Sequence, residues 1–156
     1  MPPQRSWFRV LLVGFSPMAA VFAQDEVHGH LLNLHDNGAW SWFEDERAIV
    51  DPLRGRLLVA SCADSSGVGG TARGGDIDVA WLDLSAGRFG AFELHDRLQG
   101  DDHNSPALLV RPDGRYLAVY GTHGGSHLTR WRVTTNPGDP SAWTTEASYS
   151  HPVDMS

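Results

Sequence analysis

Hydrophobic and polar residues alternate along much of the chain, and turn-forming residues interrupt the alternation at short intervals. The segment 76–82 (DIDVAWL) begins with such an alternation, which is typical of a half-buried β-strand. The same reasoning predicts seven further strands. They lie at 47–51, 56–61, 89–94, 107–110, 115–120, 126–133 and 143–149. No segment after residue 23 has the pattern of an amphipathic helix, so we predict an all-β fold.

The predicted strands fall into two cycles that superpose with an offset of 59 residues. This offset places Ile49 on Leu108 and Leu58 on Leu117. Each cycle holds four strands joined by hairpin turns, which is the sequence form of a propeller blade. A β-sandwich also contains many short strands, but the long repeat favours the propeller.

We therefore predict a partial β-propeller of four-stranded antiparallel blades at 24–156. Blade one is expected at about 45–96 and blade two at about 105–150. Propellers close with roughly four to eight blades, and an unclosed pair leaves sheet faces and edges bare. The sequence is thus expected to be a piece of a longer protein. The Gly-rich stretch 65–75 is expected to be a surface loop inserted in blade one.

The first 23 residues have the order of a secretory signal peptide. Arg5 and Arg9 precede an apolar run at 10–15, and small residues follow up to Ala23. The apolar run is too short for a membrane span, which needs about 20 residues. We predict cleavage after Ala23 and a secreted or periplasmic protein with no membrane partner. A buried amino-terminal strand or helix is the alternative.

Composition and charge exclude several classes of protein. The 156 residues carry a net charge of −7, are 41% hydrophobic and include six Trp and one Cys. The apolar content indicates a folded domain rather than a disordered chain. Cys62 has no partner for an internal disulfide, and we expect it to be a small buried residue. Loss of Arg5 and Arg9 with the signal changes the charge to −9, and an acidic chain repels nucleic acid.

Two polar clusters are candidates for catalytic chemistry. His103 lies in the cluster at 99–106, directly before blade two, and a histidine can act as a general acid or base near neutral pH. Asp101 or Asp102 could orient its ring, although an Asx-rich turn that caps the strand is the alternative. His123 lies beside glycines, as a ligand-facing position often requires, although an exposed hairpin histidine has the same pattern.

Other residue patterns give weaker indications. Trp40 and Trp42 would share one face of an extended chain, and aromatic faces stack on sugar rings or pack in a core. Trp42 is assigned to the core, and both roles stay open for Trp40. His28 and His30 offer two ligands, which do not make a metal site. No nucleotide-binding or metalloprotease motif is present, so we predict no cofactor and no metal among the site residues, and a structural metal ion in the full-length protein stays open.

Four stretches together resemble the BNR-repeat-containing proteins that include the ulvan lyases. They are GAWSWFEDERA at 38–48, GDIDVA at 75–80, DDHNSPA at 101–107 and RPDGRY at 111–116. The resemblance implies a seven-bladed propeller and the amino-terminal part of a secreted polysaccharide lyase. The implied substrate is a uronate-containing, ulvan-like glycan.

The resemblance also implies residue roles. Ulvan lyases cleave a sulfated polysaccharide next to a uronate by β-elimination, which needs carboxylate neutralisation, a base for the C5 proton and an acid for the leaving oxygen. His103 is implied as the catalytic base or acid, and His123 as the second catalytic residue, which binds or neutralises the carboxylate. Asn104, Trp40 and Arg73 are expected to bind substrate. An acidic chain needs a locally basic cleft for such a polyanion.

Part of the implied site is missing from the sequence. The tyrosine and arginine of such lyases lie in later blades, so a chain that ends at Ser156 is expected to have no lyase activity. Two alternatives are a non-catalytic, glycan-binding BNR propeller and a sialidase-like glycoside hydrolase. The hydrolase would need paired carboxylates, and Asn136 to Trp143 keep only the turn and the tryptophan of the motif Ser-x-Asp-x-Gly-x-x-Trp. The oligomeric state stays open.

Overall fold

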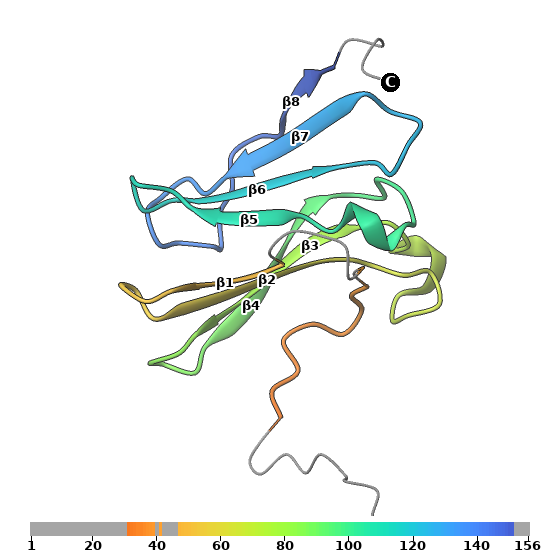
Figure 1. Ribbon diagram of the computed structural model, residues 1–156. Helices are drawn as coiled ribbons and strands as arrows, with labels where there is room; N and C mark the ends of the chain where they lie inside the picture. The colour runs from red at the N-terminus through yellow and green to blue at the C-terminus, as the bar shows by residue number, and fades with distance from the viewer. Residues whose placement is uncertain (1–30, 40, 42–46, 152–156) are drawn as a thin grey trace, which may run out of the picture. The chain divides into compact units, whose positions relative to one another are not determined.

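Two four-stranded antiparallel sheets make up the regular structure of the chain (Figure 1). The structure is a computed structural model that describes residues 31–39, 41 and 47–151. The first sheet contains β1 (Ala48–Asp51), β2 (Arg56–Cys62), β3 (Ile77–Asp83) and β4 (Phe89–His95). The second contains β5 (Ala107–Val110), β6 (Tyr116–Gly121), β7 (Leu128–Val133) and β8 (Ala147–Ser150). The predicted all-β fold is confirmed, with no α-helix among the described residues.

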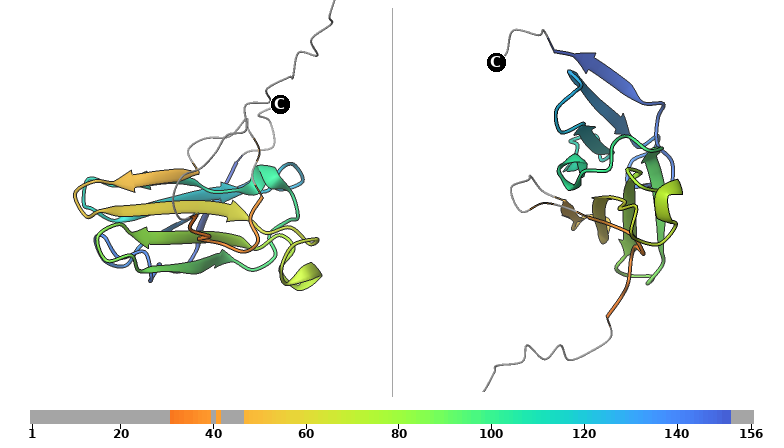
Figure 2. Two further views of the ribbon diagram at one scale, coloured as in Figure 1. Left: turned by 90° about the horizontal axis from the view of Figure 1, so that it is seen from below. Right: turned by 90° about the vertical axis from the view of Figure 1, so that its right-hand side faces the viewer.

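Neighbouring strands in each sheet are also consecutive in the chain, without a crossover (Figure 2).

Aspartates at the ends of β1 and β3 hold the turns of the hairpins that follow. Asp51 accepts hydrogen bonds from the backbone N–H of Leu53 at 3.1 Å, and Gly55 supplies the left-handed conformation with φ 59°. Asp83 and Gly87 repeat this arrangement between β3 and β4. Asx turns of this kind set the strand register.

The predicted repeat offset of 59 residues holds for β5 but is wrong for β6, its partner in the hairpin. It would pair Leu108 with Leu117, as Ile49 pairs with Leu58, but Leu108 pairs with Ala118 and Leu117 pairs with Leu109. Four residues (52–55) separate the paired Asp51 and Arg56, whereas five (111–115) separate the equivalent pair Val110 and Tyr116. Successive residues of a strand point to opposite faces of the sheet. One added residue in the connection therefore moves each side chain of the following strand to the opposite face.

The hydrophobic core lies between the two sheets, and β5 contacts β1. Leu58 and Ile77 of the first sheet pack in the same cluster as Leu108 and Tyr116 of the second. Burial of each leucine side chain contributes roughly 1.5–3 kcal/mol. The Tyr116 hydroxyl donates to the Asp51 carboxylate at 3.0 Å, and burial raises its pKa. Packing and a buried hydrogen bond thus join the sheets.

Several predictions concern residues outside the described part of the chain. These are the signal peptide at 1–23, the tryptophans Trp40 and Trp42, and the His28–His30 pair. Within the described part, no helix is long and apolar enough to cross a membrane.

Candidate active site

The loop that leads into the second sheet is built around Asp101. This residue precedes the 3-10 helix η2 (Asp102–Asn104), and its carboxylate accepts a hydrogen bond from the backbone N–H of His103 at 3.0 Å. Ser105 ends the turn and donates from its hydroxyl to the Ala39 carbonyl at 2.8 Å. The aspartate cap therefore fixes the backbone that carries His103.

Asn104 joins this loop to the loop that carries His123. Its side chain is 1% exposed, and its amide donates to the Gln99 carbonyl at 3.0 Å. Its Oδ1 accepts from the backbone N–H of His123 at 2.7 Å. Gly124 and Gly125 then turn the chain with φ of 73° and 72°. A buried amide thus sets the distance between the two histidine loops.

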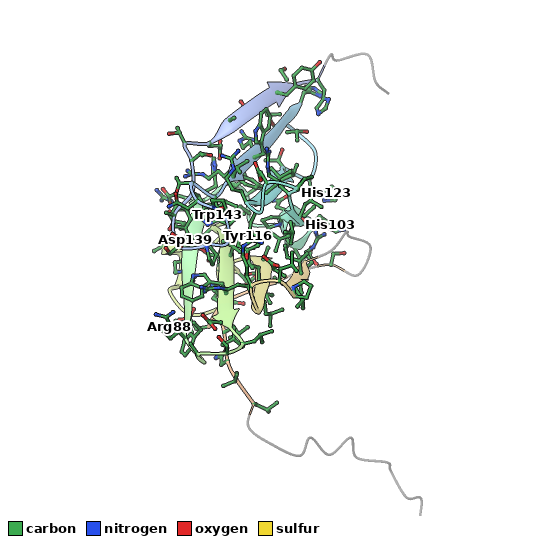
Figure 3. All side chains as sticks on the ribbon, turned by 90° about the vertical axis from the view of Figure 1, so that its left-hand side faces the viewer. Arg88, His103, Tyr116, His123, Asp139 and Trp143 are labelled. Carbon is green, nitrogen blue, oxygen red and sulfur yellow. The ribbon has the colours of Figure 1, made fainter. Side chains whose placement is uncertain are left out.

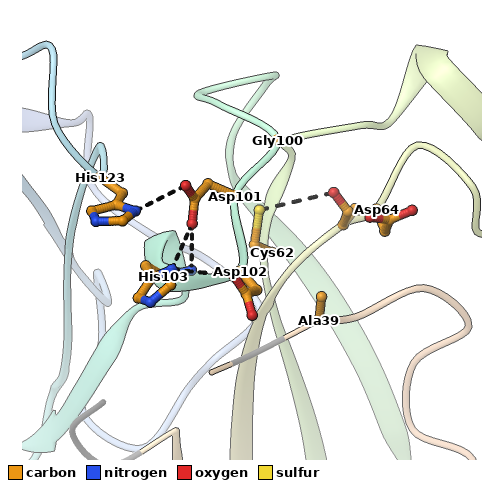
Figure 4. Close-up of a pocket in the computed structure, with 9 residues that line it drawn as sticks. Ala39, Cys62, Asp64, Gly100, Asp101, Asp102, His103 and His123 are labelled. Carbon is orange, nitrogen blue, oxygen red and sulfur yellow. Dashed lines mark hydrogen bonds and ion pairs between the residues drawn. The ribbon is translucent and has the colours of Figure 1, made fainter. Parts of the chain in front are cut away.

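A single carboxylate, that of Asp101, contacts both imidazole rings (Figure 4). Its Oδ1 lies 2.8 Å from Nδ1 of His103, and its Oδ2 lies 3.0 Å from Nδ1 of His123. The ring centroids are 4.3 Å apart. Asp102 places a second carboxylate 3.2 Å from Nδ1 of His103. The structure therefore brings together the two histidines that the sequence singles out.

The charge on Asp101 determines the tautomer of both rings. Hydrogen bonds from the backbone and ring of His103, and then from the ring of His123, lower the pKa of Asp101 to about 2. An ionised carboxylate only accepts hydrogen bonds, so each ring donates from Nδ1. A neutral imidazole that donates from Nδ1 carries its lone pair on Nε2. Each Nε2 is therefore the ring atom suited to take up a proton.

The two histidines line a pocket of about 450 Å³. Asp64 and Asp102 line it together with Asp101, and none of its described lining residues is Lys or Arg. Cys62 is also in the lining and is 1% exposed. Burial raises the pKa of its thiol to about 11, so the thiol stays protonated at neutral pH. The prediction of a small buried cysteine is confirmed, and the described lining is acidic.

The predicted substrate-binding residues do not gather in this pocket. Asn104 is buried, and its side-chain oxygen and nitrogen hold backbone groups. Arg73 lines a different pocket of about 370 Å³, beside β3 and β4. Trp40 lies outside the described residues. The substrate-binding roles of all three stay predictions, and the geometry gives Asn104 a positioning role.

Arg73 is the centre of a second polar cluster. Its guanidinium lies 2.9 Å from Asp36, 2.9 Å from Asp78 and 3.6 Å from Asp76. Nε2 of His35 lies 3.2 Å from Asp78. The carboxylates of Asp76 and Asp78 are nearly inaccessible. The positive charge of Arg73 is therefore committed to carboxylates of the protein itself.

One residue of the site region has a positioning role that sequence reasoning did not assign. Gln99 accepts a hydrogen bond from the backbone N–H of His123 at 2.9 Å through its side-chain oxygen. Tyr116 and Tyr120 are buried between the sheets, and neither lines the histidine pocket.

Figure 3 shows His103 and His123 on one side of the sheets, away from Arg88 and Asp139.

Comparison with known proteins identifies a related fold. No family model matches the sequence, and a search of curated proteins gives no match. One similar solved structure is an ulvan lyase of a new polysaccharide lyase family, PL25, with a TM-score of 0.53 and 20% identity over 71% of this chain. A second is such a lyase bound to -[GlcA(1-4)Rha3S]-, with a TM-score of 0.54 and 19% identity over 71% of this chain. The chain spans 28% of the length of each.

Proposed function

We propose that the chain forms two consecutive blades of a β-propeller and contributes the histidine pair of a polysaccharide lyase active site. The substrate is a uronate-containing, ulvan-like glycan outside the cytoplasm. The observation that carries the proposal is the Asp101 carboxylate, which orients His103 and His123 into one pocket. The fold likeness to ulvan lyases supports the architecture.

The two rings suit the parts of a β-elimination. Nε2 of His103 takes the C5 proton of the uronate, the bond from C4 to the glycosidic oxygen breaks, and that oxygen leaves with a proton donated by the tyrosine that a further blade would supply. The product carries a double bond between C4 and C5. Negative charge on Asp101 stabilises the imidazolium that forms, as an aspartate does beside a catalytic histidine. His123 binds the uronate carboxylate through a ring N–H.

The tyrosine and arginine of this chemistry must come from outside the described pocket. Tyr116 and Tyr120 point into the core, and burial raises the pKa of both hydroxyls. Arg73 is paired with aspartates. We propose that further blades of the propeller supply both groups, together with the basic surface that a sulfated glycan requires.

The hydrolase alternative fits the pocket less well. A glycoside hydrolase needs one carboxyl group that is protonated near neutral pH, so that it can act as general acid. The hydrogen bonds to Asp101 instead lower its pKa to about 2. Asp101 is thus suited to orient imidazoles and not to protonate a leaving group.

The test is the His103→Ala variant of the protein as its gene encodes it, incubated with ulvan. General acid–base catalysis typically contributes about 10²- to 10⁴-fold, so we expect kcat to fall by about that factor while ulvan binding is retained. The readout is the ultraviolet absorbance of the unsaturated uronate. His127→Ala, which removes an exposed histidine outside the pocket, is the matched control with unchanged turnover.

Other outcomes separate the alternatives. Ulvan binding without an absorbing product from the unmodified protein would favour a glycan-binding propeller. New reducing ends without ultraviolet absorbance would favour a hydrolase. Turnover that His103→Ala leaves unchanged would contradict the assignment of this residue.

A further inference from the structure

The histidine pocket also has the donor set of a metal site. The nearest donor atoms of Asp101, His103 and His123 all lie within 4.8 Å of one another. They come from two loops that the buried side chain of Asn104 holds together. The donors are therefore preorganised by the fold and are not carried by one flexible loop.

The distances are close to those of a coordinated ion. Zinc binds imidazole nitrogen and carboxylate oxygen at about 2.0–2.2 Å, so tetrahedral ligand atoms are about 3.4 Å apart. Asp101 already lies 2.8 Å from Nδ1 of His103 and 3.0 Å from Nδ1 of His123. These two distances would lengthen by about half an ångström to match the separation of ligands around a zinc ion.

The chemistry of the donors selects the class of ion. Two imidazoles and one carboxylate suit zinc, copper or nickel, whereas calcium and magnesium require mainly oxygen ligands. Asp64 and Asp102 add negative charge to the lining, which carries neither Lys nor Arg among its described residues. A lining of this sign concentrates cations.

We propose that Asp101, His103 and His123 bind one divalent transition-metal ion of the zinc class. Three protein ligands leave the fourth tetrahedral position directed to the pocket, where water or a substrate oxygen can coordinate. Binding through Nδ1 moves the ring proton of each histidine to Nε2. Metal binding and proton abstraction by Nε2 therefore exclude each other.

This part of the proposal rests on the proposed function, because a bound ion removes the lone pair that His103 needs as a base. Zinc should therefore inhibit the elimination, and a chelator should restore it. The binding step itself rests on the donor geometry alone. In the protein as its gene encodes it, metal binding without lyase activity would overturn the proposed function and leave the metal site standing.

The experiment is calorimetric titration of the full chain with Zn²⁺. We expect one strong equivalent per chain, with Ca²⁺ unable to compete. His123→Ala and Asp101→Asn should each lower the apparent affinity about tenfold or more, because even residues that only orient metal ligands change affinity by about 10- to 100-fold. A His28→Ala/His30→Ala double variant controls for the His-Gly-His sequence near the amino terminus and should keep the strong equivalent.

Imidazole ¹⁵N spectra of the unmodified chain provide a test that needs no variant. One equivalent of Zn²⁺ should shift the Nδ1 resonances of His103 and His123 and leave those of His127 in place. Absence of a strong equivalent would overturn the proposal. So would an equivalent that persists in His123→Ala, or one that disappears in the His28→Ala/His30→Ala double variant.

Discussion

The two polar clusters of the molecule differ in the kind of group at their centre, a carboxylate in one and a guanidinium in the other. In the histidine pocket, the single carboxylate of Asp101 contacts two imidazole rings. In the second cluster, the single guanidinium of Arg73 contacts three carboxylates, and His35 lies against one of them, Asp78. The histidine pocket is formed by loops at strand ends, whereas the Arg73 cluster includes Asp78 of β3, and both clusters contain aspartate and histidine.

Burial separates the roles of the clusters. The side chains of His103 and His123 are 41% and 58% exposed, so both are accessible from solvent. Asp78 is 7% exposed, and a charge buried to that degree needs a partner. Two clusters of similar polarity can therefore have different roles, so the density of polar residues in a sequence does not identify an active site. Accessible side chains held by a shared partner are the better indication.

The largest expected effect is on stability, from Arg73→Ala. Its removal leaves the carboxylates of Asp76 and Asp78 buried with less compensation, which costs about 3 kcal/mol. Urea unfolding measures the free energy. His123→Ala changes it by less than about 1 kcal/mol, because the residue is exposed. Arg97→Ala is the matched arginine control, since Arg97 pairs with Asp96 on the surface.

Two outcomes would contradict the distinction between a structural Arg73 cluster and an accessible histidine pair. If Arg73→Ala and Arg97→Ala destabilise the protein equally, the Arg73 cluster is not a structural centre. If His123→Ala is as damaging as Arg73→Ala, the histidine pair is a structural element and the distinction between the clusters is lost.

A medium effect is expected from Asn104→Ala. The variant leaves the backbone N–H of His123 and the carbonyl of Gln99 with fewer partners, and each such loss costs about 1–3 kcal/mol. We expect a loss of about 2 kcal/mol in urea unfolding, together with greater separation of the histidine loops. Zn²⁺ affinity reports that separation, and unchanged affinity would contradict a positioning role for Asn104. Ser141→Ala is a polar control on a distant loop.

Sequence reasoning located the strands because alternation and turn residues are local signals. The predicted and observed strands agree closely, and the largest differences are at the start of β7 (Leu128–Val133), two residues later than expected, and of β8 (Ala147–Ser150), four residues later, after the turn near Trp143. The repeat offset was wrong on one strand because five residues connect Val110 to Tyr116 and only four connect Asp51 to Arg56, and this one-residue difference shows only in the strand pairing.

The site was predictable in part. His103 and His123 were recognisable from their polar and glycine neighbours, and Asp101 was a candidate to orient His103. That Asp101 also contacts His123 depends on a contact 22 residues apart in the chain. Arg73 was expected to bind substrate because a sulfated glycan needs a local positive charge. Its partners Asp36 and Asp78 come from elsewhere in the fold, so local sequence could not reveal them.

The smallest expected effect is a pH dependence confined to the Arg73 cluster. The hydrogen bond to Asp78 raises the pKa of His35, with Asp36 adding to the shift and burial and Arg73 opposing it. A raised pKa stabilises the folded state below the pKa of the unfolded chain, and this contribution is lost as pH rises through the folded pKa. His35→Gln should therefore destabilise the protein more at about pH 5 than at about pH 9. Urea unfolding at both pH values measures the difference, and an Asp78→Asn background should reduce it. An equal effect of His35→Gln at both pH values would show that the Asp78 contact does not favour the charged ring.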